Sequence, residues 1–200
     1  MKALWLGIYF AVLIWSGIAP KDGFTWFLEV LPALIGLIVL AMTWRRFPLT
    51  PLAYWLVLAH MLILMVGGHY TYAEVPLFDA LRDVFHWQRN NYDRVGHVAQ
   101  GFVPALLARE VLLRLAVVNG RGWLNFLVLC FVLAVSALYE LVEWAVAAAS
   151  GDSAVAFLAT QGDEWDTQSD MALALSGGVA ALALLARMHD RQLAKLGKQS

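Results

Sequence analysis

Apolar and polar segments alternate along the chain, and six apolar stretches stand out. They cover residues 4–19, 24–42, 52–67, 95–118, 123–149 and 171–188. Each approaches the roughly 20 residues that an α-helix needs to cross about 30 Å of hydrocarbon. The pattern therefore predicts an all-α fold, a polytopic transmembrane helical bundle of about six spans, with residues 1–200 in a single integral membrane domain.

The links between these stretches are of two kinds. Residues 20–23 and 119–122 are tight turns, and the link 44–51 holds two arginines and two prolines that end the neighbouring helices. The segment 68–94 mixes aromatic with charged residues, which predicts an amphipathic segment at the membrane interface. The segment 150–169 is acidic and contains no lysine or arginine.

Composition supports a membrane protein. The chain is 61% hydrophobic and 14% charged, whereas soluble domains are roughly 45–50% apolar and about 25% charged. We therefore expect a lipid bilayer to surround it. The formal net charge of −1 argues against a nucleic-acid partner, which a basic patch would indicate. The single cysteine, Cys130, lies in an apolar run and is expected to be a small buried hydrophobe.

The basic residues predict the orientation of the bundle. With both termini in the cytoplasm, nine basic residues lie on the cytoplasmic side and four on the other, as the positive-inside rule favours. The nine are Lys2, Arg45, Arg46, Arg114, Arg121, Arg187, Arg191, Lys195 and Lys198, and the four are Lys21, Arg82, Arg89 and Arg94. An even number of spans agrees with two cytoplasmic termini.

Four polar stretches interrupt the apolar pattern. They are 67–74 (GGHYTYAE), 90–101 (NNYDRVGHVAQG), 139–144 (YELVEW) and 162–170 (GDEWDTQSD). Asp93 and His97 are spaced i, i+4, and Glu140 and Glu143 are spaced i, i+3, so each pair shares one face of its helix. In the predicted topology all four stretches reach the outer side of the membrane. We therefore expect them to form one outward-facing pocket.

The ionisable residues of these stretches are the candidate binding or metal-ligating residues. They are His69, Asp93, Arg94, His97, Glu140, Glu143, Asp166 and Asp170. Ionised groups near hydrocarbon are costly unless they face a bundle interior or a cavity. Carboxylates with one or two imidazoles suit a divalent metal ion such as Mg, Mn, Fe or Zn. A structural salt-bridge network and a proton or ion path explain the same residues, and the sequence leaves all three open.

Other residues have simpler interpretations. His60 lies in the middle of a predicted span and is expected to be a hydrogen-bonded packing histidine. Glu110 and Arg114 are spaced i, i+4 and predict an ion pair in the cytoplasmic half, where Arg109 is expected to snorkel. The adjacent glycines 177–178 favour close helix packing in the last span.

The motifs HYTYAEVPL, NYDRVGHVAQGFVPALLARE, YELVEW and GDEWDTQSDMALALSGG closely resemble the YjdF-like family of small bacterial inner-membrane proteins, over nearly the whole chain. The resemblance implies a multi-pass protein of the bacterial inner (cytoplasmic) membrane. It implies no particular reaction.

A weaker resemblance is to VanZ-like membrane proteins, which are linked to glycopeptide-antibiotic tolerance and the cell envelope. Asp93, Arg94 and His97 match the acidic-basic-x-x-His start of one helix in that pattern, and Asp170 matches the final Asp. Glu143 stands where that pattern has Gln, and the expected Asn after Asp170 is absent.

Three function hypotheses follow. The first is a protein whose acidic and histidine-containing pocket binds or moves an envelope metabolite, lipid or ion, with a small-molecule or lipid ligand as partner. The second is a metal-assisted membrane hydrolase or transferase with metal ligands and bases from the same pocket. The third is a structural membrane subunit. No HExxH, GxSxG or phosphate-loop motif occurs. A transporter would need a homo-oligomer to supply inverted repeats.

Overall fold

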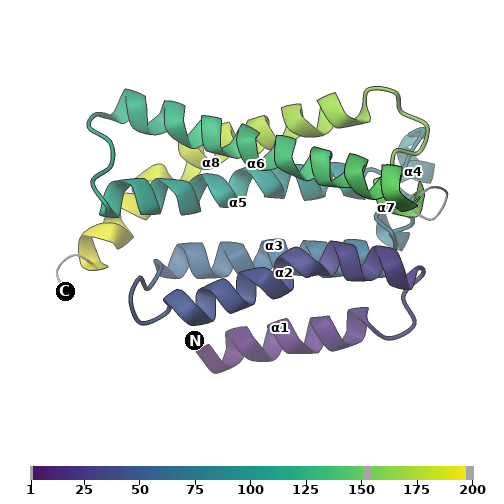
Figure 1. Cartoon of the computed structure of the whole chain (residues 1–200), viewed down its shortest axis with the longest axis horizontal. Helices are drawn as coiled ribbons and strands as arrows, with labels where there is room; N and C mark the ends of the chain where they lie inside the picture. The colour runs from purple at the N-terminus through teal and green to yellow at the C-terminus, as the bar shows by residue number, and fades with distance from the viewer. Residues whose placement is uncertain (1, 151–154, 197–200) are drawn as a thin grey trace.

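The computed structural model describes residues 2–150 and 155–196, and in these ranges every regular element is a helix (Figure 1). The helices are α1 Lys2–Ser16, α2 Gly23–Thr43, α3 Pro51–His69, α4 Pro76–Phe85, α5 Tyr92–Arg114, α6 Arg121–Ser150, α7 Val155–Leu158 and α8 Asp166–Leu196. The predicted all-α fold is confirmed for these residues. Lys198, counted above among the basic residues, lies outside the described ranges.

Four helices, α2, α3, α6 and α8, are long and apolar enough to cross a membrane. The apolar helix α1 is only 15 residues long, and α5 is 23 residues long but contains several charged and polar side chains. A count of six spans therefore needs α1 and α5 as well. Cys130, expected to be buried, is exposed on α6, in keeping with an apolar side chain that faces lipid.

The six longest helices run alternately in opposite directions, so both termini lie at one end of the bundle, with α4 and α7 at the other (Figure 1). We call these the terminal end and the α4 end. Polar side chains just before α2 and α3 cap these two helices. The Asp22 carboxylate caps α2 by accepting a hydrogen bond of 2.6 Å from the Thr25 backbone N–H. Thr50 caps α3 in the same way, with Pro51 at the first helical position.

Helices α5 and α8 approach until their backbones touch. A methyl group at Gly101 would overlap the backbone of Ala174, and one at Gly177 would overlap the carbonyl of Val98. A methyl group at Gly178 would lie 3.2 Å from the Val132 side chain of α6, which is closer than ordinary packing distance. Glycine is the residue type that allows such a contact. The expected close packing in the last helix is therefore present, and it sets α5 directly against α8.

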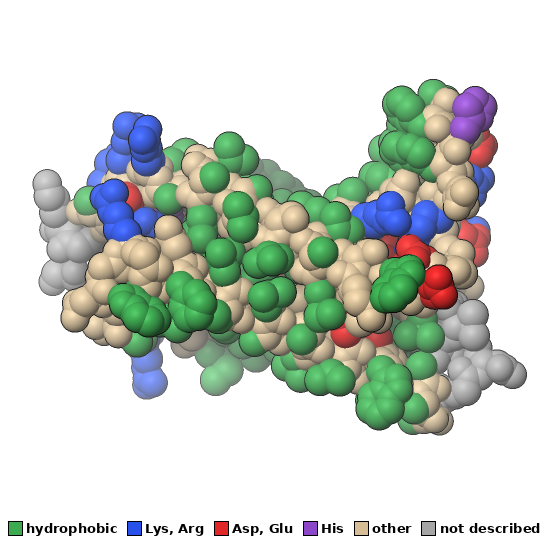
Figure 2. Space-filling model, turned by 90° about the horizontal axis from the view of Figure 1, so that it is seen from above, with side chains coloured by type: hydrophobic (Ala, Val, Ile, Leu, Met, Phe, Trp, Pro, Cys, Tyr) green, Lys and Arg blue, Asp and Glu red, His purple; other side chains and the backbone are tan. Residues whose placement is uncertain are grey.

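Helix α4 projects from the bundle as an amphipathic arm, seen at the upper right of Figure 2. None of its residues is buried. Its Leu77, Val84 and Phe85 side chains are at least half exposed. Asn90 holds the arm at its base through hydrogen bonds to the Val75 carbonyl and the Asp79 carboxylate. The amphipathic segment predicted within residues 68–94 is present as α4, and its position at the membrane interface stays a prediction.

Buried charged side chains also connect the start of α3, α5 and α8 at the terminal end. The expected ion pair between Glu110 and Arg114 is present at 3.0 Å, but Glu110 is fully buried and also accepts a hydrogen bond from Thr50 Oγ1 at 2.8 Å. Arg109 does not snorkel, because its side chain is buried and donates to His189 Nδ1 at 3.1 Å. Since an arginine only donates, His189 carries its proton on Nε2, which donates to Glu110 at 3.0 Å.

Candidate functional site

His97, on α5, lies at the centre of a buried polar cluster near the α4 end. Its Nε2 lies 3.3 Å from Asp93 Oδ1, one turn earlier on α5, and 3.6 Å from Asp170 Oδ2 on α8. Its Nδ1 lies 3.0 Å from Gln100 Oε1 and 3.9 Å from Glu140 Oε1 on α6. Three helices therefore direct ionisable side chains at one imidazole ring.

Asp93, His97 and Asp170 have the geometry of a metal-ligand set. Each offers one ligand atom, and these atoms all lie within 4.8 Å of one another. A cation placed among them can be about 2.0–2.6 Å from each, which is the range of metal–nitrogen and metal–oxygen bonds. Glu140 Oε1 is buried and has no hydrogen-bond partner within the described ranges. It lies 3.9 Å from His97 Nδ1, the ring nitrogen that does not face Asp93 and Asp170.

Arg89, in the segment between α4 and α5, joins this cluster to the loop before α8. Its guanidinium pairs with Asp166, and it lies 3.3 Å from Asp93 and 3.4 Å from Asp163. It also donates to the Ala159 carbonyl at 3.2 Å. Burial tends to lower the pKa of Arg89, but the hydrogen bond to Asp166 and the neighbouring carboxylates raise the pKa above its usual value. Arg89 therefore stays charged and fixes the acidic loop against α5.

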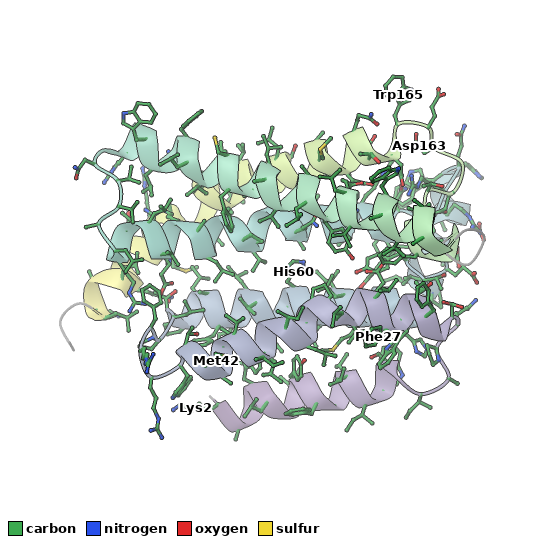
Figure 3. The ribbon with its side chains drawn as sticks, in the orientation of Figure 1. Lys2, Phe27, Met42, His60, Asp163 and Trp165 are labelled. Carbon is green, nitrogen blue, oxygen red and sulfur yellow. The ribbon has the colours of Figure 1, made fainter. Side chains whose placement is uncertain are left out.

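A cavity of about 140 Å³ adjoins the cluster. His97, Gln100 and Glu143 line it on one side, and His60 lines it on the side of α3. Figure 3 shows His60 in the middle of the bundle, between α3 and the layer of α5. The cavity also contacts Pro104, the proline inside α5. His60, expected to be a hydrogen-bonded packing histidine, lines this cavity.

The structure brings together most of the site residues predicted from the sequence. They are Asp93, His97, Glu140, Glu143, Asp166 and Asp170. Arg94 lies at the margin, where its half-exposed side chain is 3.6 Å from Asp163. His69 lies elsewhere, with Nδ1 3.0 Å from the Ser16 carbonyl and its ring against Trp15 of α1. The structure does not bring His69 to the cluster.

Three site residues did not follow from the sequence patterns. Glu29 on α2 is buried and accepts a hydrogen bond from the Tyr139 hydroxyl at 3.0 Å. Arg89 lies in the predicted segment 68–94 as a loop charge, and Gln100 belongs to no spacing that predicts a site. A signal for Glu29 was present, because it is a lone carboxylate inside an apolar stretch. Intramembrane carboxylates of that kind usually face a functional interior.

Negative charge is in excess in and around the cluster. The six carboxyl groups are those of Glu29, Asp93, Glu140, Glu143, Asp166 and Asp170. They face two cationic side chains, Arg89 and, when it is protonated, His97, which leaves an excess of four. Bound protons or a bound cation must offset the remainder, because uncompensated buried charges cost several kcal/mol each.

The comparisons with known proteins place the chain in a family. The model of the family described as "Predicted membrane protein (DUF2238)" matches residues 1–191. The chain is also similar to the inner membrane protein YjdF of Escherichia coli (strain K12), with 52% identity over 186 residues, which cover 93% of this chain and 89% of the relative. No solved structure gives a significant match. The chain therefore belongs to the DUF2238 family of membrane proteins and is a multi-pass inner-membrane protein related to YjdF.

Proposed function

We propose that this protein binds a divalent metal ion inside the membrane, with Asp93, His97 and Asp170 as ligands and the Glu140 carboxylate nearby as an additional negative charge. The ion would be bound or passed on by a pocket that opens to the side of the membrane away from the cytoplasm. One imidazole with several carboxylates suits Mn, Fe or Zn better than Ca or Mg, which prefer oxygen ligands alone.

The observation that carries this proposal is the convergence of three buried ligand atoms within 4.8 Å, taken from two helices that touch at glycine. A purely structural salt-bridge network would pair each carboxylate with a cation. Here carboxylates exceed cationic side chains, and Glu140 Oε1 has no hydrogen-bond partner within the described ranges. A divalent cation offsets two of the excess charges.

The orientation is part of the proposal. We propose six spans, including α1 and α5, with both termini in the cytoplasm, so that the α4 end faces outward. The alternating helix directions and the nine-to-four bias of basic residues support this arrangement. Alkaline phosphatase fused after Ser200 should be inactive, and the same reporter inserted between Pro76 and Phe85 should be active. The reverse pattern would place the pocket on the cytoplasmic side.

Metal analysis tests the ligand set. Protein purified in detergent, dialysed against a weak chelator and loaded with Mn²⁺ or Zn²⁺ should hold about one ion per chain by elemental analysis. The Asp170→Asn variant should lose the ion, while Asp83→Asn, on the exposed face of α4, should retain it. If the folded wild-type protein takes up no metal, the metal-binding proposal fails and the structural-subunit hypothesis is favoured.

The adjoining cavity favours a metal-assisted hydrolase or transferase as the second candidate function. Glu143 lines the cavity together with His97 and is placed to accept a proton from a water molecule there. A bound metal ion would supply the Lewis acid for such a reaction. Metal-loaded protein should then hydrolyse p-nitrophenyl acetate or p-nitrophenyl phosphate. Glu143→Gln should remove this activity without removing the metal, and no hydrolysis would favour binding alone.

A further inference from the structure

A second cavity, of about 310 Å³, lies between α5, α6 and α8 at the terminal end of the bundle. It is separate from the metal-binding pocket. Arg109, Arg121 and Arg187 line it from three different helices, and Asn125 adds an amide. Asp190 is the one acidic residue in its lining, so the cavity has an excess of two positive charges.

Arg109 is the buried arginine in the lining of this cavity. Its side chain is 6% exposed, its Nη2 lies 2.5 Å from Asp190 Oδ1, and its Nη1 donates to His189 Nδ1. The Nε of Arg109 is buried and has no hydrogen-bond partner within the described ranges. An arginine donor without a partner in a buried position is costly. An anion held beside this guanidinium would offset part of that cost.

Arg121 and Arg187 form the rim of the cavity and are exposed. In residues 2–150 and 155–196 neither lies within ion-pair distance of a carboxylate. Figure 2 shows lysine and arginine side chains gathered at this end of the molecule, next to hydrophobic side chains. Unpaired arginines at the rim of a pocket attract anions, and the guanidinium group matches the geometry of a phosphate.

The apolar surface beside the cavity belongs to the membrane. Trp123 and Phe126 on α6 are 64% and 56% exposed, and Leu184 on α8 is 72% exposed. Trp123 lies one helical turn or less from Arg121, and tryptophan is the residue type that marks the headgroup level of a bilayer. We therefore expect the cavity at the level of lipid phosphate groups, with apolar helix faces running from it toward the hydrocarbon.

We propose that this cavity binds the headgroup of an anionic phospholipid that carries two negative charges. Arg109, Arg121 and Arg187 contact the phosphate oxygens, and the acyl chains lie along the exposed apolar faces of α6 and α8. Basic pockets between membrane helices recognise phosphate headgroups by this chemistry. The site shares no residue with the metal pocket at the α4 end, so it stands whether or not the proposed function holds.

Lipid titration of the detergent-purified full-length protein tests the proposal. Native mass spectrometry with cardiolipin, phosphatidylglycerol and phosphatidylcholine should show cardiolipin bound at least tenfold more tightly than phosphatidylglycerol, with no specific binding of phosphatidylcholine. The double variant Arg121→Gln/Arg187→Gln should lose at least tenfold in cardiolipin affinity. The matched control is Arg45→Gln/Arg46→Gln, which removes two exposed charges from the α2–α3 link and should change the affinity less than twofold.

The alternatives give different results. If both double variants lose the same cardiolipin affinity, the basic end attracts lipid in general. That result would contradict a specific site in this cavity. If inorganic phosphate at millimolar concentration displaces cardiolipin completely and stabilises the wild type against heat as strongly, the cavity is a site for a soluble anion and the lipid proposal fails. Circular dichroism of each variant shows that the helices remain folded.

Discussion

His97 Nε2 on α5 and Asp170 Oδ2 on α8 lie 3.6 Å apart, although 73 positions separate the two residues in the chain. The contact exists because Gly101 and Gly177 let the two helix backbones touch. A bound divalent ion would join the two residues directly. His97→Gln should therefore lower metal affinity by more than about 100-fold, since losses of 10–100-fold are typical even for residues behind the ligands.

Isothermal titration with Mn²⁺ measures this loss. Glu110→Gln is a control, because Glu110 lies at the terminal end and belongs to a different cluster. Unchanged metal affinity in His97→Gln would remove His97 from the ligand set. A lower thermal stability of His97→Gln without any metal in the wild type would indicate a structural role.

Gly101→Ala tests the backbone contact itself. The added methyl group would overlap the Ala174 backbone, so α5 and α8 must move apart, at a cost of about 1–3 kcal/mol. Thermal unfolding in detergent should show a lower midpoint and a reduced metal content. Gly7→Ala is the matched control, because nothing lies within 4 Å of a Cβ at Gly7. Equal stability of the two variants would contradict the contact.

Arg89→Gln should be strongly destabilising. It removes the one buried guanidinium that pairs with Asp93 and Asp166, and breaking a buried ion pair by removing one partner costs about 3–5 kcal/mol. The reference variant is Arg82→Gln, whose charge pairs with the exposed Asp83 on α4. Chemical denaturation of both variants measures the difference, and a similar small effect for the two would show that Arg89 is not held in the cluster.

The cap of α2 should make part of the stability depend on pH. The Thr25 backbone N–H holds the pKa of Asp22 below its ordinary value of 3.8. The Asp22 charge therefore contributes fully to the free energy of unfolding above pH 3.8. This contribution is lost as the pH falls through the lower pKa of the folded state. Asp22→Asn keeps a capping side chain but removes this pH dependence, whereas Asp22→Ala should cost about 1 kcal/mol at pH 7. Thermal melts between pH 7 and pH 3 measure both effects.

The apolar pattern predicted the helices well because membrane helices are selected by length and hydropathy. The stretch 24–42 corresponds to α2 Gly23–Thr43, and 123–149 corresponds to α6 Arg121–Ser150. The last helix was underestimated, since α8 Asp166–Leu196 continues well beyond the apolar stretch 171–188 at both ends. Charged residues end an apolar run without ending a helix, so hydropathy alone cannot locate such boundaries.

The cluster was predicted only in part because a topology fixes the depth of a residue but not its direction around the helix axis. His69 was placed at the correct end of the bundle, yet its ring turns toward Ser16 of α1 instead of His97. Glu29 is a lone carboxylate in an apolar stretch, but its partner, Tyr139, is 110 residues away, and no local spacing connects it to the cluster. Such pairings depend on how α2, α5 and α6 rotate against one another, which local sequence does not encode.

Helix α8 also sets the position of the clusters across the bilayer. Asp170 and Asp190 are 20 residues apart on this helix, and at 1.5 Å per residue they are separated by about 30 Å, the thickness of the hydrocarbon core. If Asp190 lies among the headgroups of one leaflet, Asp170 lies at the boundary of the other. A hydrated ion would then reach Asp170 from the aqueous side without crossing hydrocarbon, and a thinner or thicker bilayer would displace one of the two aspartates from its interface.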